Sequence, residues 1–166
     1  MCSSDLDQIN RWLASWLQQC LLRRVPQDDP PSYSALQWSV VAYVLMDLLH
    51  AGVGSAWPVS LGMTLLDTLV MILFVWVVLR LMKKPARFVQ TLTALAGTGT
   101  VLGVLGLPVI LQAAQTQAED GPAGMLALGW LLMLGWSIAV QAHIYRHALS
   151  AGYSAGLLLA GLHTVL

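Results

Sequence analysis

The sequence predicts an all-α protein: a polytopic transmembrane bundle of about five helices, preceded by an amphipathic helix. Of its 166 residues, 57% are hydrophobic and only 10% are charged, and the mean hydropathy is +0.70. Soluble domains carry about a quarter charged residues. Several apolar stretches also reach the roughly 20 residues that a helix needs to cross a bilayer. We therefore expect an integral membrane protein, and its formal net charge of zero argues against nucleic acid as a partner.

The first 33 residues are predicted to form a cytosolic or interfacial segment. Residues 4–24 repeat apolar side chains at helical spacing. Two tryptophans and the pair Arg23–Arg24 are typical of a helix lying in the membrane interface. A cytosolic helix packed on the bundle explains the pattern equally well, and the sequence leaves both open. The stretch VPQDDPPSY (25–33) contains three prolines and is interpreted as a linker.

Residues 34–166 are predicted to form the transmembrane bundle. Its spans are expected at residues 34–56, 59–81, 88–114, 124–145 and 148–166. Trp57 and Pro58 are expected to turn the chain, and QTQAEDGPA (115–123) is expected to be a polar loop. The last apolar piece is 19 residues long, so it can just span if the turn before it is tight.

The basic residues predict the orientation of the bundle. All eight lysine and arginine residues fall in the N-terminal segment, the loop after the second span or the turn after the fourth. With five spans these three segments lie on one side, and the positive-inside rule places them, with the N-terminus, in the cytoplasm. The compact chain lacks eukaryotic-looking sorting signals, so we expect a bacterial cytoplasmic (inner) membrane.

Polar residues recur on one face of each of the first two spans. Tyr43, Asp47 and His50 share a helix face. Asp47 lies ten residues before Trp57 and Asp67 lies ten after it, so a helical hairpin brings both carboxylates to a similar depth. A charged side chain facing lipid costs roughly 2.5 to 3.5 kcal/mol. Both carboxylates are therefore expected to face inward.

The cluster of Asp47, His50 and Asp67 has two interpretations. One is a site that handles protons or cations, because intramembrane ionisable residues are functional candidates by default. The other is a structural lock in which neutral Asp and His side chains hydrogen-bond across helices. The lock requires only burial and pairing, and the sequence favours it. His50 is expected to donate to Asp47, and His163 is expected at a similar or shallower depth. The ligand spacing is not compact, so no metal and no cofactor are predicted.

A second group of ionisable residues lies in QAHIYRH (141–147). His143 and His147 are four residues apart and share a helix face. Two ligands can be presented at this spacing, but no third is evident. With Tyr145 and Arg146 beside them, the histidines are interpreted as an anchor at the lipid headgroups.

Small residues mark the third span. Gly99 and Gly103 have the G-x-x-x-G spacing, which predicts close approach of a neighbouring helix. Pro108 removes one backbone hydrogen bond and is expected to kink the span. The last segment repeats the pattern of small residues with Gly152, Gly156 and Ala160.

Two stretches suggest a family. RFVQTLTALAGTGTVLGVLGLP (87–108) gives a glycine-rich middle span, and WSIAVQAHIYRHALSAGYSAGLLLAGL (136–162) gives a Trp-to-His span followed by a last hydrophobic piece. This layout, over residues 34–166, resembles that of the Yip1-like membrane proteins. The resemblance implies a five-helix bundle behind a cytosolic segment and a non-enzymatic role in organising membranes with protein partners. It assigns no functional residue.

No enzyme is predicted. The sequence contains no G-x-S-x-G, Walker, dinucleotide or H-E-x-x-H signature. The first functional hypothesis is a non-enzymatic, partner-binding or membrane-organising bundle, or a subunit of a larger membrane complex. The alternative is a small transporter or channel component that uses the Asp/His cluster for protons or cations. Expected partners are the lipid bilayer and other membrane proteins, and an oligomer is compatible with the sequence.

Overall fold

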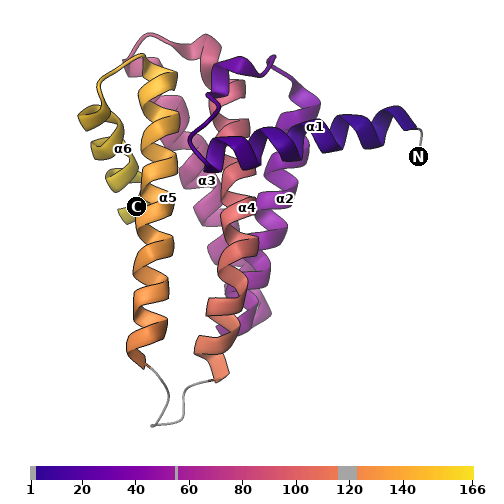
Figure 1. Cartoon of the computed structure of the whole chain (residues 1–166), viewed down its shortest axis with the longest axis vertical. Coiled ribbons are helices and arrows are strands. Elements are labelled where there is room, and N and C mark those ends of the chain that lie inside the picture. Colours follow the sequence, from indigo (N-terminus) through magenta and orange to yellow (C-terminus); the bar gives the residue numbers. More distant parts are fainter. Residues whose placement is uncertain (1–2, 55, 116–122) are drawn as a thin grey trace.

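The computed structural model describes residues 3–54, 56–115 and 123–166, and these residues form helices and loops without a strand. Figure 1 shows the long helices side by side, the short C-terminal helix beside them and the N-terminal helix crossing them. The α-helices are α1 Ser3–Cys20, α2 Tyr33–Gly54, α3 Trp57–Leu81, α4 Phe88–Gln115, α5 Ala123–Leu149 and α6 Tyr153–Val165. Two 3₁₀ turns, η1 Pro26–Asp28 and η2 Pro85–Arg87, precede α2 and α4. The predicted all-α class is confirmed.

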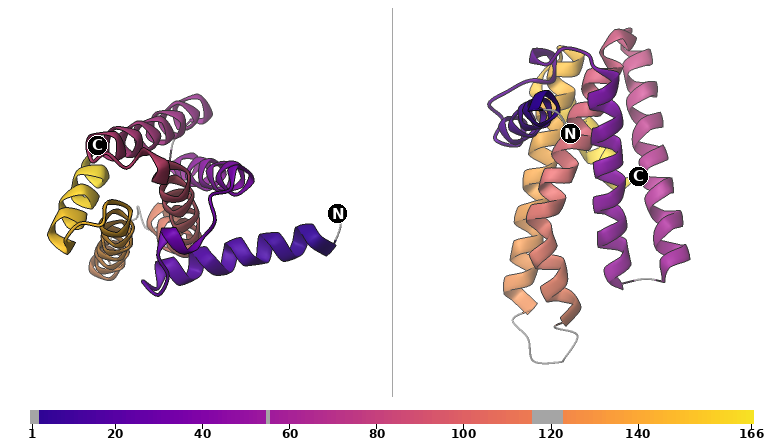
Figure 2. Two further views of the ribbon diagram at one scale, coloured as in Figure 1. Left: turned by 90° about the horizontal axis from the view of Figure 1, so that it is seen from above. Right: turned by 90° about the vertical axis from the view of Figure 1, so that its right-hand side faces the viewer.

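Within the described residues, four helices are long and apolar enough to cross a membrane: α2, α3, α4 and α5. They contain 22, 25, 28 and 27 residues. At 1.5 Å of rise per residue, each exceeds the roughly 30 Å of a hydrocarbon core. By contrast, α6 has 13 residues, about 20 Å of helix, and ends near mid-height of the bundle (Figures 1 and 2). The fifth full span predicted over residues 148–166 is therefore not confirmed.

Several element boundaries differ from the prediction. Helix α1 ends at Cys20 instead of residue 24. Trp57 and Pro58 are the first two residues of α3, a position that proline tolerates well. They therefore begin the helix and are not the connection between α2 and α3. Helix α5 continues one turn past Tyr145, which shortens the last segment. Most of the predicted polar loop at 115–123, with Glu119 and Asp120, lies outside the described residues.

Three helices end at the same end of the bundle by the same backbone motif. Leu22, Lys83 and Ser150 follow α1, α3 and α5 with φ angles of 59°, 57° and 52°, in the left-handed region. The next amide then bonds five residues back, as from Lys84 to Leu79 at 2.8 Å and from Ala151 to Arg146 at 3.0 Å. Such Schellman motifs satisfy the last carbonyls of a helix.

Cationic side chains complete the end of α5. The Lys84 ammonium donates to the Leu149 carbonyl at 2.6 Å. The Arg87 guanidinium donates to the carbonyls of Ala148 at 2.8 Å and His147 at 3.1 Å. Cations are favoured at this negative end of the helix dipole. The loop between α3 and α4 is thereby joined to the turn before α6.

Helix α4 is the centre of the bundle, and its glycines determine how closely its neighbours approach. It packs against α1, α2, α3 and α5. A Cβ atom on Gly99 would lie 2.8 Å from the Tyr43 ring of α2, and one on Gly103 would lie 2.7 Å from Met46. The close approach predicted from the G-x-x-x-G spacing is confirmed, with α2 as the partner. On another side, a Cβ on Gly97 would lie 2.4 Å from Trp16 of α1.

Candidate functional site

The polar stripe of α2 faces α4. Because Gly103 has no side chain, the His50 ring approaches the α4 backbone, and its Nε2 lies 3.1 Å from the Gly103 carbonyl oxygen, which accepts the hydrogen bond. The predicted hydrogen bond from His50 to Asp47 is replaced by this contact. Asp47, one turn before His50, is half-buried.

Asp67 lies at the edge of the corresponding stripe on α3. Ser60, Thr64, Thr68 and Met71 of this stripe are buried, but Asp67 is exposed on the bundle surface. Successive residues are rotated by 100° around a helix, so Asp67 lies about 60° to one side of Thr64. Asp67 is therefore not buried between the helices, although its carboxylate does meet a polar partner on α2. Its oxygen accepts a hydrogen bond of 2.6 Å from the Tyr43 hydroxyl, which ties α3 to α2.

His163 reaches the bundle interior from the last turn of α6. A Cβ on Gly156 would lie 2.5 Å from the Ala142 carbonyl oxygen, so α6 packs directly on the backbone of α5. This packing places the His163 Nδ1 2.9 Å from the Gln141 Oε1 and 3.1 Å from the Tyr145 hydroxyl. The imidazole also stacks on Phe74 of α3, with ring centroids 5.1 Å apart. His163 thus joins α3, α5 and α6.

Helices α2 to α6 line a partly open cavity of about 230 Å³. Its polar wall consists of Tyr43, Asp47 and His50 from α2, Thr98 from α4, Ser137 and Gln141 from α5, and His163 from α6. Four of the candidate site residues predicted from the sequence therefore line one cavity: Tyr43, Asp47, His50 and His163. Asp67 does not line the cavity but is hydrogen-bonded to Tyr43, which does. A carboxylate beside imidazole and hydroxyl groups suits water, protons or a small cation.

The sequence did not predict the contributions of Thr98, Ser137 and Gln141. Their helices carry other polar residues as well, and only the packing of α4, α5 and α6 shows which of these residues face the cavity. Gln141 begins the QAHIYRH stretch, so its polarity was a usable signal. For Thr98, the hydroxyl donates to the Ala94 carbonyl at 2.7 Å, a local bond that makes a polar residue tolerable in any apolar helix.

His143 and His147 lie outside this cavity and hold the linker. Their ring centroids are 4.5 Å apart, and the His143 Nε2 lies 3.2 Å from the Arg24 carbonyl oxygen, to which it donates. His143 therefore ties the residue before the linker to α5, and His147 packs against the His143 ring. Within the described ranges, no group of three or more His, Cys, Asp or Glu side chains is arranged to hold a metal ion.

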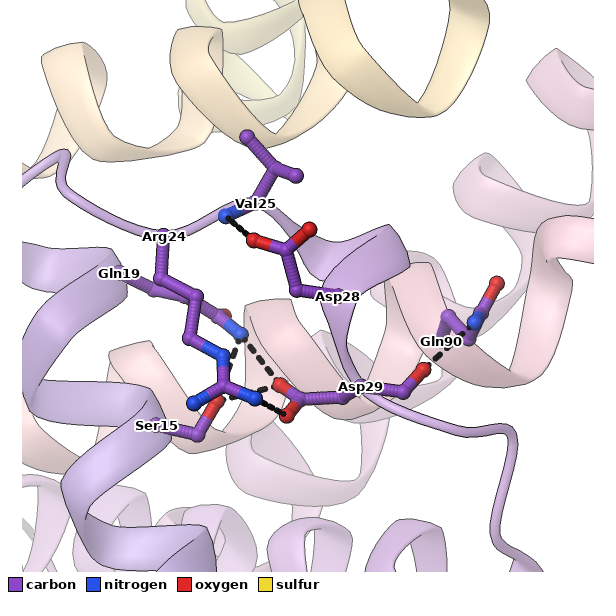
Figure 3. Close-up of polar contacts among 7 residues, drawn as sticks. All are labelled: Ser15, Gln19, Arg24, Val25, Asp28, Asp29 and Gln90. Carbon is purple, nitrogen blue, oxygen red and sulfur yellow. Dashed lines mark hydrogen bonds and ion pairs between the residues drawn. The ribbon is translucent and has the colours of Figure 1, made fainter.

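A second polar cluster joins α1 to the linker (Figure 3). The Asp29 carboxylate accepts hydrogen bonds from the Ser15 hydroxyl and, at 3.0 Å, from the Gln19 amide. It also forms an ion pair of 2.8 Å with Arg24, and its backbone carbonyl accepts from Gln90 of α4 at 2.6 Å. A cavity of about 430 Å³ lies next to this cluster, between α1, the linker and the first turns of α2 and α4.

No protein-family model matches the chain, and neither a curated protein nor a solved structure is significantly similar to it. The Yip1-like resemblance therefore rests on the layout of the sequence. Four apolar helices of spanning length are compatible with a membrane-embedded protein. Any function beyond that has to be argued from the site.

Proposed function

We propose that this protein is an integral membrane protein whose central cavity binds and exchanges protons or monovalent cations at Asp47. The observation that carries the proposal is a half-buried carboxylate lining a polar cavity of about 230 Å³ among helices of spanning length. Of the two functional hypotheses from the sequence, this is the second one, a transporter or channel component that uses the Asp/His cluster. Intramembrane carboxylates that line a cavity commonly mark ion pathways.

The cavity favours exchange over a purely structural lock. A lock needs only that its polar groups pair across helices, as the Tyr43 hydroxyl and the Asp67 carboxylate do. Asp47 interacts with the Thr64 side chain of α3, but it also lines a space that is large and polar enough to hold water. Water or a bound cation lowers the cost of the charged carboxylate, and loss of either favours its protonated form. His50 and His163, on two walls of the same cavity, are groups that can exchange a proton with Asp47 through water.

Ion flux through purified protein in liposomes tests this proposal. The liposomes contain a pH-sensitive dye, and flux is driven by a potassium diffusion potential, with sodium and potassium fluxes followed in parallel. We expect flux above that of empty liposomes and a decrease of about tenfold or more in Asp47→Asn, because the amide cannot ionise. Asp7→Asn is the matched control: Asp7 is exposed on α1, outside the cavity, so the same chemical change should leave flux intact.

Two outcomes would contradict the proposal. One is the absence of flux for protons, sodium and potassium in a folded, reconstituted protein. The other is equal flux in the wild type and Asp47→Asn.

A role as a partner-binding bundle or a subunit of a larger complex is the second candidate, and Asp67 favours it. Asp67 is exposed on a helix whose neighbouring side chains Leu65, Leu66 and Leu69 are exposed and apolar. A carboxylate facing lipid costs roughly 2.5 to 3.5 kcal/mol. The Tyr43 hydroxyl offsets part of this cost, and a polar group from another membrane protein in contact with Asp67 would offset more of it.

The proposed orientation has the N-terminus in the cytoplasm of a bacterial cell, with the bundle in the inner membrane. The linker, the loop between α3 and α4, and the turn before α6 all lie at one end of the bundle (Figure 1). The basic residues of the chain are concentrated in or next to these segments and α1. The positive-inside rule supports the cytoplasmic placement of this end.

A further inference from the structure

Helix α1 has an exposed apolar face. Leu13, Leu17 and Leu21 follow one another at intervals of four residues and have 42%, 50% and 55% of their surface exposed. Ile9 extends the same row. Residues four apart lie on one side of a helix. A helix that only packs on a bundle in water would instead bury its largest apolar face against it.

The polar contacts of α1 determine where this face points. Ser15 and Gln19 bond to Asp29 in the linker (Figure 3). Residues two apart are rotated by about 200° around a helix, so Leu17 and Leu21 point away from the linker. Helix α1 crosses the bundle below the linker (Figure 1). The exposed leucine row therefore points parallel to the long helices, toward their mid-height.

We propose that the row of Ile9, Leu13, Leu17 and Leu21 lies in the lipid bilayer, at the boundary between headgroups and acyl chains. The spanning-length helices also expose large apolar side chains, such as Val41 and Leu45 of α2, which the same bilayer would cover. The exposed polar residues Asp7, Arg11 and Gln18 occupy another side of α1, where headgroups and water would meet them. A basic or polar face beside an apolar one is typical of interfacial helices.

The contact with α4 fixes α1 at this depth. The ring of Trp16 fits over Gly97, and the Trp136 indole of α5 donates to the Cys20 carbonyl at 2.9 Å. Trp16 and Cys20 are buried in this contact. The bundle thus holds the buried side of α1, and the bilayer would cover the leucine row. This inference rests on the proposed membrane insertion and is independent of ion exchange.

Quenching of a fluorescent label in nanodiscs tests the inference. Leu17→Cys and Gln18→Cys are compared in the full chain after Cys2→Ser and Cys20→Ala, each carrying the same environment-sensitive label. Lipid-borne nitroxides and aqueous iodide serve as quenchers. We expect the label at 17 to be quenched by nitroxides about 5 to 10 Å below the headgroups and protected from iodide. The adjacent label at 18 should be quenched by iodide. Leu66→Cys, on the exposed surface of α3, reports insertion of the bundle itself.

Every outcome distinguishes the hypotheses. Lipid quenching at both 66 and 17 supports the inference. Lipid quenching at 66 with iodide quenching at 17 overturns it and leaves membrane insertion intact. Protection at 17 from both quenchers also overturns it, because another protein or segment would then cover the row. Iodide quenching at 66 contradicts membrane insertion and removes the basis of both proposals.

Discussion

At the scale of single residues, the glycines of α4 allow side chains of the neighbouring helices to lie against its backbone. Gly99 and Gly103 admit Tyr43 and His50 from α2, and Gly97 admits Trp16 from α1. The first two contacts form one wall of the cavity, while the third holds the N-terminal helix. Three glycines on one helix therefore connect the candidate site to the proposed interfacial helix through the same backbone.

Substitution of Gly97 by alanine should release α1. The new Cβ would lie 2.4 Å from the Trp16 ring, so the ring has to move, at a cost of about 1 to 3 kcal/mol for overpacking. Cys20 reports the change: burial raises the pKa of its thiol to about 11, from an ordinary value of 9.0. Release lowers this pKa, increases the thiolate fraction near neutral pH and accelerates alkylation, measured by mass spectrometry in Cys2→Ser protein.

Gly62→Ala is the control for this prediction. A Cβ on Gly62 meets no atom within 4 Å, so alkylation of Cys20 should keep its wild-type rate. Equal, slow alkylation in Gly97→Ala would show that Trp16 moves without releasing α1.

At the scale of elements, three helices end with an ordinary side chain in a conformation that favours glycine. The motif after α1, α3 and α5 aligns the linker, the loop before α4 and the turn before α6 at one end of the bundle. Lys84 and Arg87 then bond the last carbonyls of α5. The start of α6, and hence the depth that His163 reaches, depends on this group of helix ends.

Lys83→Gly should stabilise the bundle. At φ 57°, the left-handed conformation costs a residue with a Cβ atom roughly 1 to 2 kcal/mol, whereas glycine adopts it without this cost. The free energy of unfolding, measured by denaturant titration in detergent micelles, should rise by about 1 kcal/mol. Lys83→Ala removes the same charge and keeps the Cβ, so it should show no such gain. Equal stability of the glycine and alanine variants would contradict the strain argument.

At the scale of the whole molecule, the parts that the sequence predicts well depend on local periodicity. Apolar length predicted five spans, and four of them are helices of spanning length in the described residues. Helical spacing placed Tyr43, Asp47 and His50 on one face, and all three line the cavity. The length of α6 could not be predicted in this way, because the residue that ends α5 in a left-handed conformation is Ser150. Glycine is the residue that usually marks such a helix end in a sequence. Long-range packing decided the remaining contacts.

Two parts of the site illustrate that limit. Asp67 was expected to match Asp47 in depth and direction, but the rotation of α3 leaves it exposed, with Tyr43 as its partner. The cluster around Asp29 joins residues from α1, the linker and α4, and no sequence spacing connects them. Both arrangements depend on how whole helices are rotated and stacked.

The exposed carboxylate of Asp67 leads to a prediction about assembly. If a polar group of another chain covers it, Asp67→Leu should remove that contact and release the protein as a smaller species. The measurement is native mass spectrometry of protein extracted in a mild detergent, with the wild type expected in a larger complex. Leu66→Ala is the matched control, because it changes a neighbouring exposed side chain and leaves the carboxylate in place. A wild-type protein that is monomeric, or an unchanged complex in Asp67→Leu, would contradict the assembly. In that case the Tyr43 hydroxyl, and not a partner protein, is the group that stabilises the Asp67 carboxylate.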